Sequence, residues 1–472
     1  MSRNVRFTRA ALVAASFAVA LACTPALARA QALALTGATV HTVTGPTLEN
    51  ATIVIENGHI TAVGTAVNVP AGATVVPCAG KQIYPGLVDA NSMLGLVEVS
   101  SVRGTVDSQE AGEVNPNIRA EVQINPGSEL IPVARANGLT SALIVPRGGA
   151  LCGTSALVHT DGWTHEDMQV AAPVALHVQW PNMTPNRAWW ETRSDEEQKK
   201  ARDEQIKRLS DAFNDARAYA NAVSAEGQKG IPRHDRDVKW DGMVKAIHGE
   251  IPVAFHVDRL NQIRAALKFA DEQGLKRIVL VGASDADQIA DELKARDIAV
   301  IAGPTLDLPT RTWEPYDEKM SQPERLREAG IRFCISNGGG ETMNARNLPY
   351  QAAMAAAYGL PKDEALKSVT LYPAQIMGVA DKVGSIEPGK IADLVVTNGD
   401  LLEITTTVEQ VYVAGRASSM ENRQTRLFHQ YDNRPRGPKA RVHTVVGVTE
   451  PGMPGSTNEA HATTNANGGK TK

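Results

Sequence analysis

Two histidines lie near the ends of short apolar runs, where they could take part in chemistry. His177 stands in PVALHVQW, and His256 stands in IPVAFHV. Neutral imidazole is the commonest metal ligand among side chains, and barrel enzymes place their active sites at strand ends. The pair could form half of a metal site. A pair of histidines without a carboxylate also fits a purely structural role.

The elements that position these histidines alternate between apolar runs and helical patterns from residue 84 to 380. The runs are SALIVP, PVALHVQW, IPVAFHV, RIVLVGA, IAVIAG and IRFCIS. This alternation predicts βαβ units and a parallel sheet. With six such units in a chain of 472 residues, we expect a (β/α)8 TIM-like barrel and a small second domain.

The second domain is predicted from two β-rich segments at either side of the barrel. Residues 33–83 contain runs in which apolar and polar residues alternate, with Asn57-Gly58 as a hairpin turn. Residues 381–433 repeat this pattern, with Gly and Asn at the turns. We therefore expect one composite β-sandwich formed by the N- and C-terminal segments. The tail over 434–472 is rich in Pro, Gly, Thr and Asn without periodicity, and is predicted to be disordered.

Residues 189–220 carry dense opposite charges at i,i+4 spacing and a thin apolar stripe. This pattern predicts a solvated surface helix inserted in a barrel loop, with a partner-binding helix as the alternative. Three tryptophans close to it could line a ligand pocket or pack this helix against the barrel: Trp180, Trp189 and Trp190.

The N-terminus indicates export. Three arginines precede an apolar run over residues 10–23, and Ala28-Arg29-Ala30 follows as a cleavage pattern; the arginines are Arg3, Arg6 and Arg9. These are the parts of a signal peptide over residues 1–30, cleaved near Ala30, so the mature protein is expected to be periplasmic or secreted. An uncleaved anchor or a lipid on Cys23 is the alternative.

The composition narrows the classes of protein to which this chain can belong. A net charge of -4 gives no electrostatic footprint for nucleic acid, whose binders usually carry a basic face, and no later segment has the apolar length of a membrane span. The three cysteines beyond the signal segment are widely spaced and odd in number, which predicts buried thiols and no disulfide framework: Cys78, Cys152 and Cys334.

Three passages, in the right order, resemble the amidohydrolase superfamily and its imidazolonepropionase-like branch. They are GKQIYPGLVDANSMLGL (80–96), IPVAFHVDRLNQIRAALKFADEQGLKRIVLVGA (251–283) and the C-terminal stretch over 344–396. The resemblance implies one or two divalent metals, zinc or similar, at the C-terminal ends of the barrel strands. It also implies hydrolysis of carbon–nitrogen bonds other than peptide bonds by a metal-activated water.

The individual ligand positions depart from that family pattern. The strand-one histidines fall on Asn91 and Met93, the strand-six histidine falls on Val281, and the strand-eight aspartate falls on Asn337 or Gly338. None of these side chains suits a hard or borderline metal. We therefore expect a degenerate metal site, or no metal.

Among the family's ligand positions, only the strand-five histidine is kept, as His256, and His177 falls near the bridging ligand of strand four. Asp89 matches the acidic residue just before the missing histidines, where we expect a structural hydrogen-bonding role. Asp258 and Glu341 could supply carboxylates at the mouth, although solvation is the simpler interpretation. The stretch PRGGALCGTSALV (146–158) resembles a substrate loop of the family.

Two functions follow. The first is a hydrolase with an altered or impaired metal site around His256 and His177. The second is a non-catalytic member that binds a small molecule, or that pairs as a subunit with an intact paralogue. A homodimer is a further expectation, and no substrate can be read from the sequence.

Overall fold

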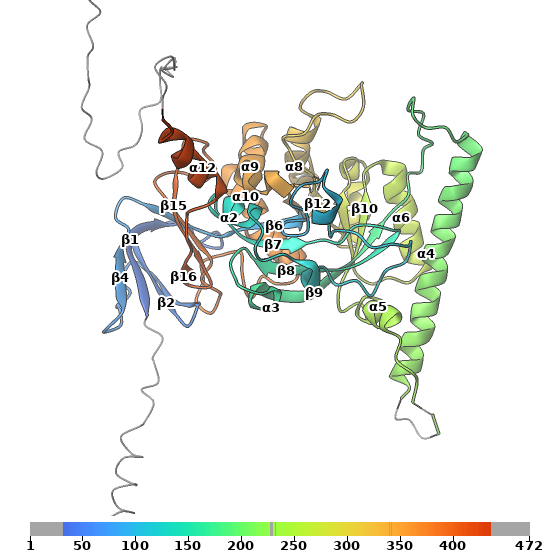
Figure 1. Cartoon of the computed structure of the whole chain (residues 1–472), viewed down its shortest axis with the longest axis horizontal. Coiled ribbons are helices and arrows are strands. Elements are labelled where there is room, and N and C mark those ends of the chain that lie inside the picture. The colour runs from blue at the N-terminus through green and yellow to red at the C-terminus, as the bar shows by residue number, and fades with distance from the viewer. Residues whose placement is uncertain (1–31, 227–229, 232, 339, 341, 436–472) are drawn as a thin grey trace, which may run out of the picture. The chain divides into compact units, whose positions relative to one another are not determined.

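Two β-sheets flanked by helices make up the computed structural model of this chain, in which residues 32–226, 230–231, 233–338, 340 and 342–435 are described (Figure 1). One compact unit extends to Arg426, and the residues from Leu427 onward form another. No helix in these described stretches is long and apolar enough to cross a membrane. The predicted signal peptide over 1–30 and nearly all of the predicted tail lie outside the described residues.

The barrel sheet contains eight strands in the order β13-β12-β11-β10-β9-β8-β7-β6. Their bounds are β6 Leu87–Ser92, β7 Leu139–Ile144, β8 Leu151–His159, β9 Gln169–Gln179, β10 Val253–Val257, β11 Ile278–Gly282, β12 Ala299–Ala302 and β13 Phe333–Ile335. The two ends of the sheet meet where the backbone N–H of Asn337 donates to Asp89 Oδ1 at 3.1 Å. This nearly closed sheet confirms the predicted TIM-like barrel.

The expectation of a wholly parallel sheet was wrong at one strand. β8 runs antiparallel to both β7 and β9, so residues 151–158 form a barrel strand and not the substrate loop expected for them. Gly148 and Gly149, with φ of 93° and 73°, allow the chain to reverse tightly between β7 and β8 without a helix. The reversal leaves Arg147 at the end of the barrel where β7 terminates.

The second sheet joins both ends of the described chain. It contains β1 Leu33–Val40, β2 Leu48–Glu56, β3 His59–Gly64, β4 Thr74–Pro77, β5 Gln82–Pro85, β14 Leu394–Thr397, β15 Val408–Val413 and β16 Arg416–Ala417. β5 pairs antiparallel with β14, which confirms that the N- and C-terminal segments build one β domain. Asn57 and Gly58 form the predicted turn between β2 and β3, with φ of 52° and 81°.

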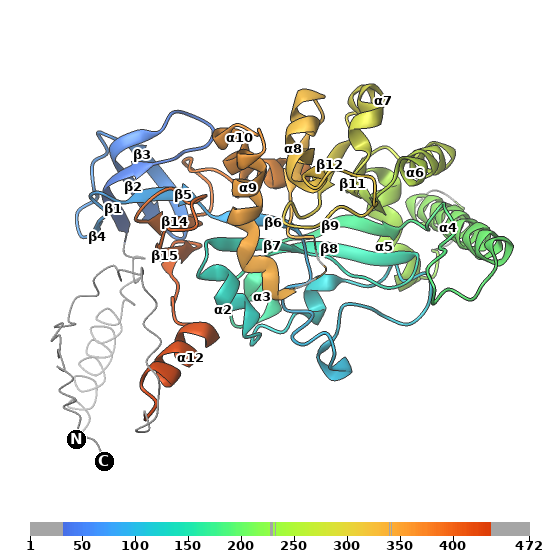
Figure 2. The same cartoon turned by 90° about the horizontal axis from the view of Figure 1, so that it is seen from above.

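The helices α6, α7, α8 and α9 follow one another along one side of the barrel strands (Figure 2). The helix bounds are α2 Leu130–Arg135, α3 His165–Met168, α4 Asp195–Ser224, α5 Val238–His248, α6 Leu260–Glu272, α7 Ala290–Ala295, α8 Glu318–Glu328, α9 Leu348–Ala357, α10 Lys362–Ser368, α11 Leu371–Ile376 and α12 Arg423–Asp432.

The helix predicted from the charge pattern over 189–220 is α4, the long green helix of Figure 1. It starts at a capping box in which Ser194 and Glu197 satisfy each other's backbone N–H groups. Its thin apolar stripe is buried and includes Phe213, whose ring meets Phe269 of α6 edge-on. The charged remainder is left to solvent, as the sequence predicted.

Candidate functional site at the barrel mouth

His177 and His256 face the interior of the barrel from neighbouring strands. β9 and β10 are parallel, with His177 opposite Ala254 and Gln179 opposite His256. Side chains alternate along a strand, so His177, Ala254 and His256 share one face. Ala254 belongs to the apolar core inside the barrel, which identifies that face as the inner one.

The two histidines belong to a chain of hydrogen bonds that ends in a guanidinium. His177 Nδ1 lies 2.9 Å from His256 Nε2, and His256 Nδ1 lies 3.0 Å from Nη1 of Arg147. Nη2 of Arg147 donates to Asn91 Oδ1 at 2.9 Å. Sequence reasoning missed Arg147, although its place directly after the SALIVP run was a signal that it would lie at the mouth.

The guanidinium fixes the proton positions along this chain. Arg147 can only donate, so Nδ1 of His256 must accept and its Nε2 must carry the proton. His256 then donates to Nδ1 of His177, which leaves the proton of His177 on Nε2. Each neutral imidazole has one lone pair, and both lone pairs are already taken.

Burial keeps both histidines neutral. It lowers the pKa of His177 from 6.5 to about 3, with Arg147 as the second cause. The pKa of His256 is also well below its ordinary value, through burial first and then the charge of Arg147 and the proximity of His177. Arg147 itself is partly buried, which lowers its pKa, yet a guanidinium stays protonated in proteins.

Most of the predicted ligand positions converge on the same end of the barrel. Val281 lies opposite His256 on β11, and Asn337 accepts from Nε2 of Gln351 at 3.3 Å. Gly338 and Asn91 line the cavity described below. Met93 is the exception, since it packs against the apolar core between the barrel and its helices.

Asp89 joins the two ends of the barrel sheet, β6 and β13, by a hydrogen bond. Its Oδ1 accepts from the backbone N–H groups of Asn91 and Asn337, at 3.2 and 3.1 Å. Its Oδ2 is buried without a hydrogen-bond partner in the described part of the chain. Burial raises the pKa of this carboxyl from 3.8 to about 7, against the lowering effect of the two N–H groups. This geometry matches the structural role expected from the sequence.

A cavity of about 220 Å³ opens over the histidines and the guanidinium. Its lining comes from the ends of barrel strands, from the loops that follow them and from α8: Asn91, Arg147, His256, Asp258, Val281, Gly282, Ser284, Gly303, Pro304, Asp307, Lys319 and Gly338. Asp258 is not merely solvated, because its carboxylate accepts from Ser284 Oγ and lies 3.8 Å from Lys319 Nζ. Glu341, the other carboxylate considered for the mouth, lies outside the described residues.

The donors at this mouth do not fit a divalent metal. Within the described residues, no three His, Cys, Asp or Glu side chains gather in a group that could hold one. The two imidazole lone pairs accept N–H groups, and a positive guanidinium lies at hydrogen-bonding distance from His256. Among the residues that the structure describes here, a metal cation would meet charge repulsion and no imidazole nitrogen with a free lone pair.

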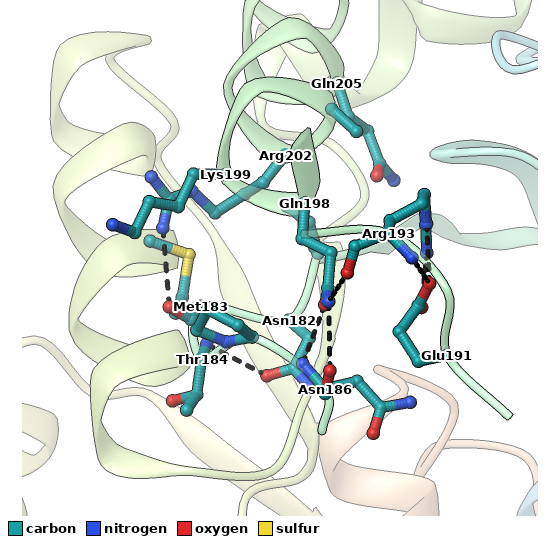
Figure 3. A pocket seen from close by; sticks show the side chains of 13 residues that line it. Asn182, Met183, Thr184, Asn186, Glu191, Arg193, Gln198, Lys199, Arg202 and Gln205 are labelled. Atoms are coloured by element: carbon teal, nitrogen blue, oxygen red, sulfur yellow. Dashed lines mark hydrogen bonds and ion pairs between the residues drawn. The ribbon is translucent and has the colours of Figure 1, made fainter. Parts of the chain in front are cut away.

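A second hollow of about 300 Å³ lies where the β9–α4 loop meets the start of α4 (Figure 3). Its polar side chains are engaged with one another: Arg193 pairs with Glu191 at 2.8 Å, and Gln198 donates to the Asn186 carbonyl at 2.9 Å. These contacts order the loop. We therefore place the functional site at the barrel mouth.

The tryptophans take two different positions. Trp180 is buried and packs against Phe255 and Phe269, so it serves the core between β10 and α6. Trp189 and Trp190 are 92% and 64% exposed. Neither alternative expected from the sequence, a pocket wall or a brace for the helix, describes these two.

The described thiols are buried and free, as predicted: Cys78, Cys152 and Cys334. Burial raises the pKa of each of these thiols. At neutral pH they are protonated and behave as small apolar side chains.

Comparison with known proteins gives a consistent picture. The sequence model described as Amidohydrolase family matches residues 164–418. The amidohydrolase tasK of Hapsidospora irregularis is 25% identical over 398 residues, which are 77% of this chain and 39% of tasK. The imidazolonepropionase of Rhizorhabdus wittichii is 29% identical over 168 residues, 35% of this chain and 39% of that protein. The chain thus spans about two fifths of the length of these curated relatives.

Among solved structures, an amidohydrolase from Thermotoga maritima MSB8 superposes with a TM-score of 0.72 and 26% identity. The superposition covers 82% of this chain and 99% of that one. The barrel and the β domain therefore recur together in a protein of related sequence.

Proposed function

This chain belongs to the amidohydrolase family, and from that premise we propose that its barrel mouth binds a small molecule bearing a carboxylate or a similar anion through Arg147. The family generally uses divalent metals. Here we propose that metal-assisted hydrolysis by the family's usual ligand set is lost or impaired. The observation that carries the proposal is the guanidinium hydrogen-bonded to Asn91 and His256 at family ligand positions.

The charge of Arg147 supports an anionic ligand. Its described side-chain partners are an amide oxygen and a neutral imidazole, and no carboxylate in the described chain pairs with it. A partly buried charge without a counter-ion is unfavourable, and a planar guanidinium pairs with carboxylates through two parallel N–H bonds. An anion entering the cavity would supply the missing partner.

Binding of short mono- and dicarboxylates, with their amides as neutral controls, tests this proposal by calorimetry. Arg147→Gln is expected to weaken carboxylate binding about 10- to 100-fold, as for the loss of a charge-assisted hydrogen bond. Arg311→Gln is the control, because Arg311 is already paired with Asp285 at 2.6 Å. Equal affinity in the wild type and in Arg147→Gln would refute the role of Arg147.

Metal content provides an independent test. Protein prepared with zinc, iron and manganese supplied is expected to carry clearly substoichiometric metal by plasma mass spectrometry, because no imidazole lone pair is free at the mouth. A chelator should leave its melting temperature unchanged. Stoichiometric metal that is lost in His256→Ala would restore the metal-hydrolase interpretation.

Hydrolysis of a carbon–nitrogen bond outside peptides is the second candidate function. The family match and the resemblance to imidazolonepropionases favour it. It would need a nucleophile that does not depend on the family's ligand positions. Pairing with an intact paralogue, and export through residues 1–30, remain proposals that size-exclusion chromatography and N-terminal sequencing of the mature protein would test.

A further inference from the structure

We propose that Ser284 is a nucleophile that accepts acyl groups from amides or esters in the barrel-mouth cavity, with Asp258 as proton acceptor and Lys319 as the neighbouring cation. The inference rests on the proposed function in one respect, namely that Arg147 holds the anionic end of the substrate.

Three elements bring these side chains together. Asp258 directly follows β10, Ser284 lies two residues beyond β11, and Lys319 is in the first turn of α8. The Oγ of Ser284 donates to Asp258 Oδ1 and accepts from Lys319 Nζ at 2.6 Å. An ammonium group can only donate, so the single hydroxyl proton of Ser284 is directed at the carboxylate.

This arrangement gives the serine a base and a neighbouring cation. A nucleophilic hydroxyl needs a base within hydrogen-bond reach, and the carboxylate of Asp258 is already bonded to the hydroxyl proton. Lys319 places a positive charge beside Oγ of Ser284, where it stabilises the negative charge that this oxygen gains as its proton leaves. Its side chain is 13% exposed, so water screens that charge only weakly.

The cavity links this network to the anion-binding end. Ser284, Asp258 and Lys319 line the same cavity of about 220 Å³ as Arg147 and His256. A small molecule held by its carboxylate at Arg147 therefore shares the space with the Ser284 hydroxyl.

The reaction balances without a further reagent. Oγ of Ser284 attacks the carbonyl carbon while its proton passes to Asp258, and the carbon–nitrogen bond breaks as the amine takes that proton. An ester on Ser284 remains. Water then attacks this ester, Asp258 takes a proton from the water and returns it to Oγ, and the carboxylic acid leaves. The sum is amide plus water giving acid plus amine.

An activated ester with one carboxylate, mono-para-nitrophenyl glutarate, tests the inference on the full chain. We expect a stoichiometric burst of nitrophenolate and a glutaryl group that peptide mapping locates on Ser284. Ser284→Ala and Asp258→Asn should abolish the burst, and Lys319→Met should slow it. Ser321→Ala is the matched control. Ser321 lies on α8, as Lys319 does, and its hydroxyl donates to the Asp317 carbonyl.

Ser284→Cys guards against a folding defect, because a thiol at this position should carry the glutaryl group as a thioester. The inference is overturned if the wild type gives no adduct at Ser284, or if Ser284→Ala keeps the burst. If glutarate binds through Arg147 but the ester does not acylate Ser284, the nucleophilic role of Ser284 is refuted and the proposed function stands. If neutral para-nitrophenyl valerate acylates Ser284 but no carboxylate binds at Arg147, the proposed function is refuted and the nucleophilic role of Ser284 stands.

Discussion

Asp89→Asn is expected to stabilise the protein by up to about 4 kcal/mol at about pH 8, because one pKa unit corresponds to about 1.4 kcal/mol. The pKa of Asp89 is about 7 in the folded chain against an ordinary 3.8, with burial as the main cause. Asparagine keeps the oxygen that accepts from Asn91 and Asn337, and it removes the buried negative charge.

The sign of the pH dependence follows from the raised pKa. The folded state holds the proton of Asp89 more tightly than the unfolded state does, so this group's contribution is present below about pH 4 and is lost as the pH rises through about 7. The gain from Asp89→Asn should therefore be small at about pH 4 and should grow toward about pH 8.

Urea unfolding across this pH range measures the effect. The control is Asp307→Asn, an exposed carboxylate that lines the barrel-mouth cavity, for which we expect a change within about 0.5 kcal/mol. Equal destabilisation by Asp89→Asn at both ends of the pH range would contradict the buried-charge explanation.

Gly153→Ala is expected to destabilise the fold by about 3–5 kcal/mol, combining the cost of a left-handed residue with overpacking. Gly153 lies on β8 opposite His177, with φ of +112°. A Cβ there would lie 2.5 Å from the Ile118 carbonyl oxygen, which is backbone and cannot rotate away. Because β8 pairs with β9, the strain should also reach His177.

Chemical denaturation of Gly153→Ala measures the loss, with Gly104→Ala as the matched control. A Cβ at Gly104 meets nothing within 4 Å, and its φ is ordinary. We expect the control to lie within about 0.5 kcal/mol of the wild type. A Gly153→Ala protein as stable as this control would show that the segment around Ile118 yields easily.

The strands of the barrel were predictable from the sequence because short apolar runs alternate with helical patterns along the chain. The apolar runs PVALHVQW and IPVAFHV predicted the strands β9 and β10. The family resemblance placed His256 correctly near the end of β10. The two terminal β segments share turn chemistry and alternation, so their union in one sheet was also predictable.

The strand direction of β8 was not predictable in the same way. The stretch over 151–158 is fully buried, and a continuous apolar run does not distinguish a parallel from an antiparallel neighbour. The double glycine turn that precedes it decided the direction, and with it the position of Arg147.

The sequence by itself determined the fold class, the separation of the β domain from the barrel, and the absence of imidazole and carboxylate groups at Asn91, Met93 and Val281. Tertiary structure alone decided that Arg147 meets His256 and that Ser284 meets Asp258 and Lys319. The reason is physical: periodicity encodes burial along one element, whereas these contacts join loops from different strands. Their distances are set by turn geometry, strand register and rotamers, which no single segment contains.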